Sequence, residues 1–476
     1  MKTTWIATLI IGLLSVAVYT QAQHNASYEN ELPESARLLS RYIQIPSVSG
    51  DEHQAGEYLA DVCREKGFYV ETFPGTEDSG FNFAASLYPL EKGKPNIIFL
   101  NHIDVVPAGS DSLWTYPAYS GTIADGKVWG RGVLDMKGMT IMQLLALEEL
   151  SSALVNELPY NVTLLCVSRE EVDNGGAKTV AEQYCEYLNP IVMFGEGGAG
   201  IRGLSSSNPD HLFFTVSVAE KKALWLKLIL EIPSSGHGSV PPLQYTNQVI
   251  VKALSRLVDH KTRLRFDETT GSMFQVLGKH ERGIKKTVLS RPRLFKFLLT
   301  PTVRREPILM ATLTNTITVT NLSNPVLASN QIAQEVQVML DCRLLPGTDK
   351  DQFITSLKKV LKCDEINFTI TQETPSAAPS RPGEFYQMFK DAIISVHPGS
   401  SVIPTLFPAY SDNTYFRNKG VPVYGINPVY LSLEQLKSVH NFNEHISIEE
   451  LEKGKRVYFT FLKSIAGQQE ILARQQ

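Results

Sequence analysis

Short apolar runs alternate with helix-like segments between about residues 31 and 218. The apolar runs, at residues 96–100, 162–167 and 191–194, have the length and composition of buried strands. Apolar residues recur at helical spacing in residues 139–150 and, less regularly, in 176–187. Buried strands separated by helices are typical of sheets covered on both faces. This region therefore predicts a doubly wound, mixed α/β sheet with parallel strands at its centre.

The pattern changes at about residue 219. Four leucines, at positions 224, 226, 228 and 230, alternate with other residues, as in a strand with one buried face. A helix pattern follows at 247–259 and a further strand at 336–341. We therefore predict an α+β unit over residues 219–346, inserted into one catalytic domain made of residues 31–218 and 347–476.

Two further segments of the chain have distinct patterns. Residues 279–305 are rich in Lys and Arg and lack a clear period, so we expect a solvated excursion on the inserted unit. A long amphipathic helix is expected from about residue 448 to near the end of the chain.

The N-terminus predicts export. Lys2 precedes an apolar run over residues 5–19 that ends near Ala22. The run is shorter than the ~20 apolar residues that span a bilayer, so residues 1–22 are expected to be a cleaved signal peptide. The mature chain would then be periplasmic or extracellular, with no membrane partner.

The charge of the chain narrows the classes of partner. The 476 residues carry 45 Lys and Arg against 49 Asp and Glu, a formal net charge of −4. Nucleic-acid-binding proteins have a strong basic excess, so no nucleic-acid partner is expected. The five cysteines are scattered and contain no CxxC pair, so a cysteine-type zinc site is not expected either.

Histidines and carboxylates follow the apolar runs. Three runs end at such residues: His102, the pair Glu170–Glu171, and Glu196. Asp135 lies in a Gly-rich loop, and His440 stands near the C-terminus. Ligands of open α/β sheets gather outside the carboxyl ends of the strands. Two imidazoles with several carboxylates form a ligand set that suits Zn²⁺.

The order of these motifs is similar to that of a known family. Asn101-His102-Ile103-Asp104-Val105-Val106-Pro107 resembles a signature of the zinc metallopeptidases related to aminoacylase, glutamate carboxypeptidase, carboxypeptidase S and succinyl-diaminopimelate desuccinylase. The loop 130–138, the Glu170–Glu171 pair, residues 235–242 and His440 follow in the family's order. The resemblance covers nearly the whole mature chain.

The resemblance implies two Zn²⁺ ions, or Co²⁺ or Mn²⁺ in their place. It divides five ligands between them: His102 and Glu196 on one ion, Glu171 and His440 on the other, and Asp135 bridging both. Glu170 would be the general base for a metal-bridging hydroxide. The peptide bond between Asp135 and Met136 would be cis.

Three more residues are expected to support the reaction or to bind substrate. Asp104 is expected to accept a hydrogen bond from the His102 imidazole and fix its tautomer. The resemblance implies that His237 reaches an active site, often that of the neighbouring subunit, and helps to hold the oxyanion. The inserted unit would then be a lid and dimerisation domain of a homodimer. Arg343 matches a family arginine that binds a substrate carboxylate.

These features predict hydrolysis of an amide bond next to a free carboxylate in small peptides, as by a dipeptidase or carboxypeptidase. The alternative substrate is an N-acyl amino acid, as for an aminoacylase. A third hypothesis, an inactive binding homologue, predicts an eroded ligand set. The family often has a Thr-Asp-x-Arg string where this chain has Ser411-Asp412-Asn413-Thr414, and Arg417 lies three residues further on.

Overall fold

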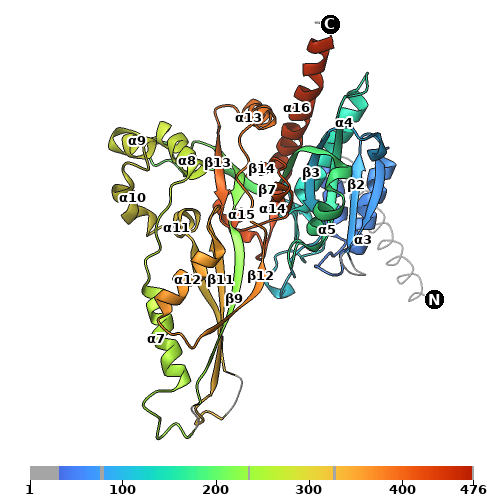
Figure 1. Cartoon of the computed structure of the whole chain (residues 1–476). Coiled ribbons are helices and arrows are strands. Elements are labelled where there is room, and N and C mark those ends of the chain that lie inside the picture. Colours follow the sequence, from blue (N-terminus) through green and yellow to red (C-terminus); the bar gives the residue numbers. More distant parts are fainter. Residues whose placement is uncertain (1–31, 76–79, 234–235, 325–327, 474–476) are drawn as a thin grey trace, which may run out of the picture.

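The computed structural model describes residues 32–75, 80–233, 236–324 and 328–473, so the predicted signal peptide lies outside the described residues. A large unit is built around an eight-stranded sheet, and a narrower unit extends from it on a four-stranded sheet (Figure 1). Among the helices of the described ranges, none combines the length and apolarity needed to cross a membrane.

The large sheet is mixed. Its strands, in spatial order, are β1 (Tyr69–Pro74), β2 (Phe81–Ser86), β6 (Asn161–Val167), β3 (Asn96–His102), β7 (Pro190–Ile201), β14 (Val423–Tyr430), β8 (Phe213–Glu220) and β13 (Ser401–Phe407). The central strands β6, β3, β7 and β14 are parallel. β1 and β2 pair antiparallel at one edge, and β8 and β13 run against β14 at the other. The mixed α/β sheet predicted from the sequence is confirmed.

Helices cover both faces of the large sheet. They are α2 (Glu34–Ile43), α3 (His53–Glu65), α4 (Lys137–Ala153), α5 (Gly175–Gln183), α6 (Cys185–Leu188), α13 (Glu384–Val396), α14 (Asn413–Asn418), α15 (Leu433–Ser438) and α16 (Ile448–Ala473). Ile97 and Phe99 of β3 join the core under α4 and α16, whereas Ile98 and Leu100 join the core under α5 and α14. Successive side chains of a strand point to opposite faces, so an apolar run serves both layers.

The small sheet is antiparallel. Its strands, in spatial order, are β10 (Thr316–Ser323), β11 (Glu335–Leu344), β9 (Lys222–Glu231) and β12 (Asn367–Glu373). The alternating leucines of β9 lie in a core with residues of α7 (Thr246–Asp259) and α12 (Lys350–Leu361). Because β12 pairs with β9, this sheet extends beyond residue 346, where the sequence pattern placed the boundary, to Glu373.

Four helices are inserted between α7 and β10: α8 (Glu268–Lys279), α9 (Gly283–Ser290), α10 (Lys296–Val303) and α11 (Pro307–Leu313). The excursion expected at residues 279–305 consists of short helices that also bury some of their side chains. Met273, Val288 and Val303 share a core with Phe213 of β8 and Ile403 of β13. The helices are short and carry apolar residues on two sides, which obscures their period in the sequence.

Candidate metal centre

Three neighbouring parallel strands bring the first predicted ligands together. β6, β3 and β7 lie side by side. Glu170 and Glu171 follow β6, His102 ends β3, and Glu196 lies within β7, two residues past Phe194, where the pairing of β7 with β3 ends. Nε2 of His102 lies 3.9 Å from a carboxylate oxygen of Glu196. The sheet edge is thus the position at which ligands of open α/β sheets gather.

A small three-stranded sheet adds the other two predicted ligands. Its strands are β15 (His445–Ser447), β5 (Lys127–Trp129) and β4 (Ile123–Ala124). Asp135 follows β5 and His440 precedes β15, so the pairing of these strands holds the two loops next to each other. The cis peptide bond expected between Asp135 and Met136 is present.

Asp135 lies between the two histidines. Its Oδ1 is 3.1 Å from Nε2 of His102, and its Oδ2 is 3.1 Å from Nε2 of His440. The same His440 nitrogen lies 3.0 Å from Oε1 of Glu171. Each oxygen of one carboxylate therefore faces a different imidazole, as a carboxylate that bridges two ions requires.

The donor atoms have the spacing of metal ligands. Two groups of three residues place one donor atom each within 4.8 Å of one another: His102, Asp135 and Glu171, and His102, Glu170 and Glu196. Two ligands that lie ~2.0–2.1 Å from a tetrahedral Zn²⁺ are roughly 3.3 Å apart. The histidine–Asp135 and histidine–Glu171 distances are close to this value, so these residues fit a metal centre.

The crowded carboxylates of the cluster favour the binding of cations. Burial and the neighbouring carboxylates raise the pKa of Glu196 well above its usual range, and burial raises the pKa of Glu170 likewise. Hydrogen bonds to Asp135 and Glu171 raise the pKa of His440 to about 10. Carboxylates crowded in a buried site repel one another, so bound divalent ions would favour their charged forms.

Asp104 acts through different atoms from those expected. Nδ1 of His102 donates to the backbone carbonyl of Asp104 at 2.8 Å, whereas the Asp104 carboxylate is 3.8 Å away. That carboxylate accepts from the backbone N–H groups of Glu170 and Glu171, at 3.0 and 3.1 Å. The backbone of Asp104 therefore orients the imidazole, and its side chain holds the loop that carries both glutamates.

Glu444 is a positioning residue that sequence reasoning missed. Its buried carboxylate accepts from the backbone N–H groups of Gly132 and Leu134, at 3.0 and 2.7 Å, and pairs with Arg131 at 2.9 Å. These contacts hold the loop that presents Asp135. The signal in the sequence was its place four residues after His440, at the end of Asn441-Phe442-Asn443-Glu444.

The chain segment that departs from the family pattern, Ser411–Thr414, is buried beside the centre. Asp412 accepts from Asn174 at 2.9 Å, and Asn174 also donates to Glu170 at 3.3 Å. Arg417 pairs with the buried carboxylate of Glu220 at 3.0 Å and donates to the backbone carbonyl of Val423. Arg417 is therefore used inside the large unit and is not presented to a substrate.

Arg343 lies at the end of β11 nearest the large unit. Its guanidinium pairs with Asp341 at 2.7 Å and stacks 5.0 Å from the ring centre of Tyr410. Burial and the nearby Glu170 carboxylate raise the pKa of Tyr410. Arg343 thus adjoins the metal centre through Tyr410, and its predicted role in substrate binding stays a prediction.

His237 lies at the opposite end of the small sheet. It follows the outer end of β9, is exposed, and its imidazole bonds to Ser239 and Asn330, at 2.6 and 3.0 Å. Strands rise ~3.3 Å per residue, so the two ends of β9 are roughly 30 Å apart. The structure therefore does not bring His237 to the metal centre of its own subunit.

The fold and the ligand cluster define a hydrolase of the metal-dependent α/β type. The family model described as peptidase family M20/M25/M40 matches residues 98–464, and the chain belongs to this family. Dinuclear, metal-dependent hydrolysis is typical of its members, and zinc is their usual metal.

Several relatives are similar over nearly their whole length. The chain is 26% identical to an N-fatty-acyl-amino acid synthase/hydrolase of Bos taurus, over 96% of this chain and 95% of that protein. It is 23% identical to a probable carboxypeptidase S-like protein of Dictyostelium discoideum, over 90% and 85%.

Solved structures share the fold. A metallo-carboxypeptidase of Sulfolobus solfataricus superposes with a TM-score of 0.69 at 20% identity, over 91% of this chain and 99% of that one. Human carnosine dipeptidase 1 superposes with a TM-score of 0.62 at 15% identity, over 94% and 98%.

Proposed function

We propose that this protein is a dinuclear zinc hydrolase that cleaves the amide bond of small peptides next to a free carboxylate. The observation that carries the proposal is the position of Asp135, with one oxygen toward His102 and the other toward His440. This arrangement supports two metal positions that share one carboxylate. The complete ligand set argues against an inactive binding homologue.

The zinc ligands would be His102 and Glu196 on one ion, Glu171 and His440 on the other, and Asp135 on both. When bound, Zn²⁺ acts as a Lewis acid that polarises the scissile carbonyl and lowers the pKa of water toward ~7.

Glu170 is the general base in this proposal. Burial and the nearby Asp412, Glu171 and Asp135 carboxylates raise its pKa, which suits a group that must accept a proton and then return it. Asn174 donates to one Glu170 oxygen and the Asp104 side chain anchors the Glu170 backbone. Glu170 would take a proton from the attacking water and deliver it to the leaving amine.

His237 is proposed to act across a homodimer. Within its own subunit it lies beyond the outer end of β9, but an exposed histidine at the tip of a long sheet can reach a second copy of the chain. There it would donate to the oxyanion that forms at the scissile carbonyl. Arg343, next to Tyr410 and the metal centre, would bind the substrate carboxylate.

N-acyl amino acids are the second candidate substrate. The relatives described as N-fatty-acyl-amino acid synthase/hydrolases match this chain over nine-tenths or more of its length in Bos taurus and Homo sapiens. The same chemistry serves both substrates, since each presents an amide bond beside a carboxylate.

The test is a substrate panel with defined metal. Chain stripped by a chelator is reloaded with Zn²⁺, Co²⁺ or Mn²⁺ and assayed on dipeptides and on N-acyl amino acids of increasing acyl length. We expect close to two equivalents of zinc per chain and turnover of dipeptides. Full activity of metal-free protein contradicts the metal centre, and turnover of acyl amino acids alone replaces the peptidase proposal with the deacylase.

A further inference from the structure

The inserted helices carry an excess of positive charge. Residues 279–305 contain nine Lys or Arg and one acidic residue, Glu281, although the whole chain has a net charge of −4. Glu281 is buried and accepts from Ser206 and Ser207. Within the described parts of the chain, none of these nine cations forms an ion pair with a carboxylate.

Large apolar side chains stand exposed among these cations. Leu294, Phe297 and Leu298 are 64%, 69% and 48% exposed. Phe297 and Leu298 lie in the first turn of α10 and Leu294 in the turn just before it, and we name these three residues the α10 face. Ile284 of α9 and Ile308 of α11 are exposed as well. Soluble monomers seldom expose such a group without a use for it.

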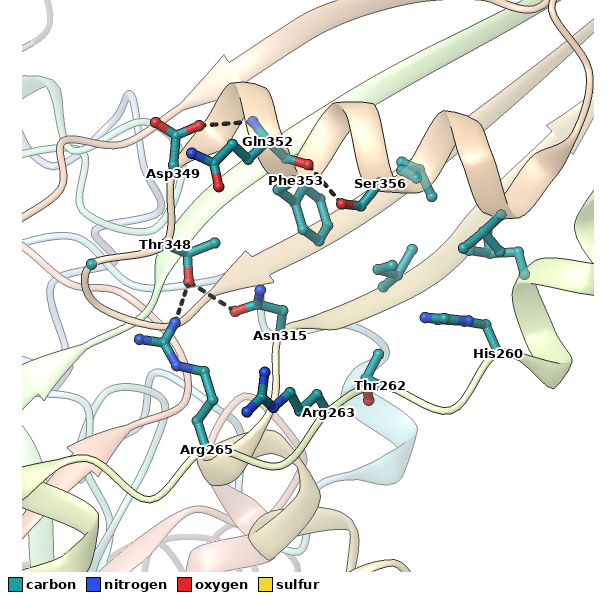
Figure 2. A pocket seen from close by; sticks show the side chains of 15 residues that line it. His260, Thr262, Arg263, Arg265, Asn315, Thr348, Asp349, Gln352, Phe353 and Ser356 are labelled. Carbon is teal, nitrogen blue, oxygen red and sulfur yellow. Dashed lines mark hydrogen bonds between the residues drawn. The ribbon is translucent and has the colours of Figure 1, made fainter.

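The basic surface continues into two adjoining cavities. One cavity, of about 430 Å³, is lined by four cations, Arg263, Arg265, Arg293 and Lys296, and by one acidic residue, Asp267. Arg263 and Arg265 also line a second cavity, of about 530 Å³, between α12 and β10. Figure 2 shows both arginines extending from the segment after α7, with Arg265 bonded to Thr348. These cavities offer guanidinium groups to an anionic headgroup.

We propose that the α10 face and the cations around it form a docking surface for an anionic lipid bilayer. Apolar side chains ringed by Lys and Arg are what an interfacial segment needs, because the apolar groups enter the acyl boundary and the cations meet anionic headgroups. On this proposal the chain binds a membrane, contrary to the expectation drawn from its sequence. The surface is independent of the proposed substrate.

Two other occupants fit less well. A two-fold contact with a second copy would set the same patch against itself, so its unpaired cations would face one another. Single-stranded nucleic acid stacks its bases on aromatic rings, whereas this surface exposes mainly leucine and isoleucine. An acidic protein partner remains as an outcome of the test.

The test measures sedimentation of the full chain with vesicles of phosphatidylglycerol mixed with phosphatidylcholine, and with pure phosphatidylcholine. All variants share residues 1–31, so any contribution of that segment is constant. Leu294→Ser with Phe297→Ser removes the apolar contact, and Lys286→Glu, Arg291→Glu and Arg305→Glu together reverse charge. Each set should lower the partition coefficient on anionic vesicles on the order of tenfold or more.

Matched controls sit on the large unit. Val155→Ser with Leu433→Ser replaces two apolar residues that are 92% and 68% exposed. Lys178→Glu, Lys419→Glu and Lys463→Glu make the same change in net charge at exposed positions. We expect both controls to bind like the unchanged chain, and all variants to keep its melting temperature.

Three outcomes overturn the proposal. They are binding of both variant sets as strong as that of the unchanged chain, equal binding to uncharged vesicles, and no vesicle binding by the unchanged chain. The last result together with retention on a polyglutamate matrix, lost in the charge-reversed variant, would assign the surface to an acidic protein instead.

Discussion

The two predicted histidine sites at opposite ends of the molecule differ in what holds them. At the metal centre, the His102 side chain is 1% exposed, and its two ring nitrogens face Asp104 and Asp135. At the tip of the small sheet, His237 is exposed and contacts only near neighbours on the tip, Ser239 and Asn330. The first is pre-organised by the fold of one subunit. If the second has a catalytic partner, that partner lies outside its own subunit.

The backbone shows the same contrast. Arg169, Asn174, His440 and Asn443, all beside the metal centre, have positive φ although none is glycine. Such conformations cost free energy and persist where surrounding contacts impose them. At the tip, positive φ falls on Gly236, where no side chain opposes it. The site therefore includes backbone conformations that surrounding contacts must hold, whereas the tip uses a glycine.

Replacing Glu170 by Gln tests the metal centre and has the largest expected effect. Loss of the general base should lower kcat by about 10²–10⁴. Metal content should stay the same, because Gln keeps the shape of the side chain and the five proposed ligands remain. Steady-state kinetics and elemental analysis check the result, with Glu182→Gln on the exposed side of α5 as the control. An unchanged rate would remove Glu170 from the mechanism.

Substitution of His237 by Ala tests the proposed role of the tip of the small sheet. If it holds the oxyanion across a dimer, kcat should fall by about 10²–10³, with little change in the stability of an exposed tip. His260→Ala, another exposed histidine of the small unit, should behave like the unchanged chain. Mixing inactive His237→Ala and Glu170→Gln chains should restore part of the activity through hybrid dimers. Absence of recovery would argue against action in trans.

Glu444→Ala tests how much the hydrogen bonds that hold the Asp135 loop contribute to zinc affinity. It removes four acceptor contacts from the loop that carries Asp135 and leaves the Arg131 guanidinium buried without its partner. Zinc affinity should fall by about 10–100-fold, as for other residues that orient ligands. Glu281→Ala is the control, since it also removes a buried carboxylate that accepts several hydrogen bonds, from Ser206 and Ser207, but lies among the inserted helices. Equal zinc affinities in the two variants would contradict the role of Glu444.

Lys221 lies where the chain passes from the large unit to the small one, and it should make the free energy of unfolding depend on pH. It connects β8 to β9, and its buried amine donates to the backbone carbonyl of Ala311 and to Thr316. Burial lowers the pKa of Lys221 to about 7, against ~10.4 in an unfolded chain. Between these values the unfolded chain holds the extra proton, so this residue makes the free energy of unfolding rise with pH.

The expected slope is at most about 1.4 kcal/mol per pH unit between pH 7 and pH 10. Lys221→Met should lose that rise, whereas Lys227→Met, on β9, should keep it. Denaturant unfolding at several pH values measures the difference. Parallel stability curves for Lys221→Met and the unchanged chain would show that the amine stays protonated in the folded state.

Much of the architecture could be predicted because it rests on local patterns. The apolar runs at residues 96–100 and 162–167 became β3 and β6, and the leucine alternation became β9. The helix-like pattern at 247–259 became α7. Residues 279–305 could not be predicted in this way, because their helices are short and bury Val288 and Val303 against strands far away in the sequence.

The candidate ligands could be predicted because each adjoins an element that the sequence pattern indicates. His102 stands at a strand end, and Asp135 lies in a Gly-rich loop. Tertiary structure alone decided which atoms meet. The pairing of β5 with β15 and the contacts of Glu444 bring His440 to Asp135 across about three hundred residues of chain. Hydrogen bonds depend on distances that a linear pattern does not encode, which is why the backbone role of Asp104 and the loop contacts of Glu444 emerged only from the fold. The sequence thus determined the chemistry available, and long-range packing determined its geometry.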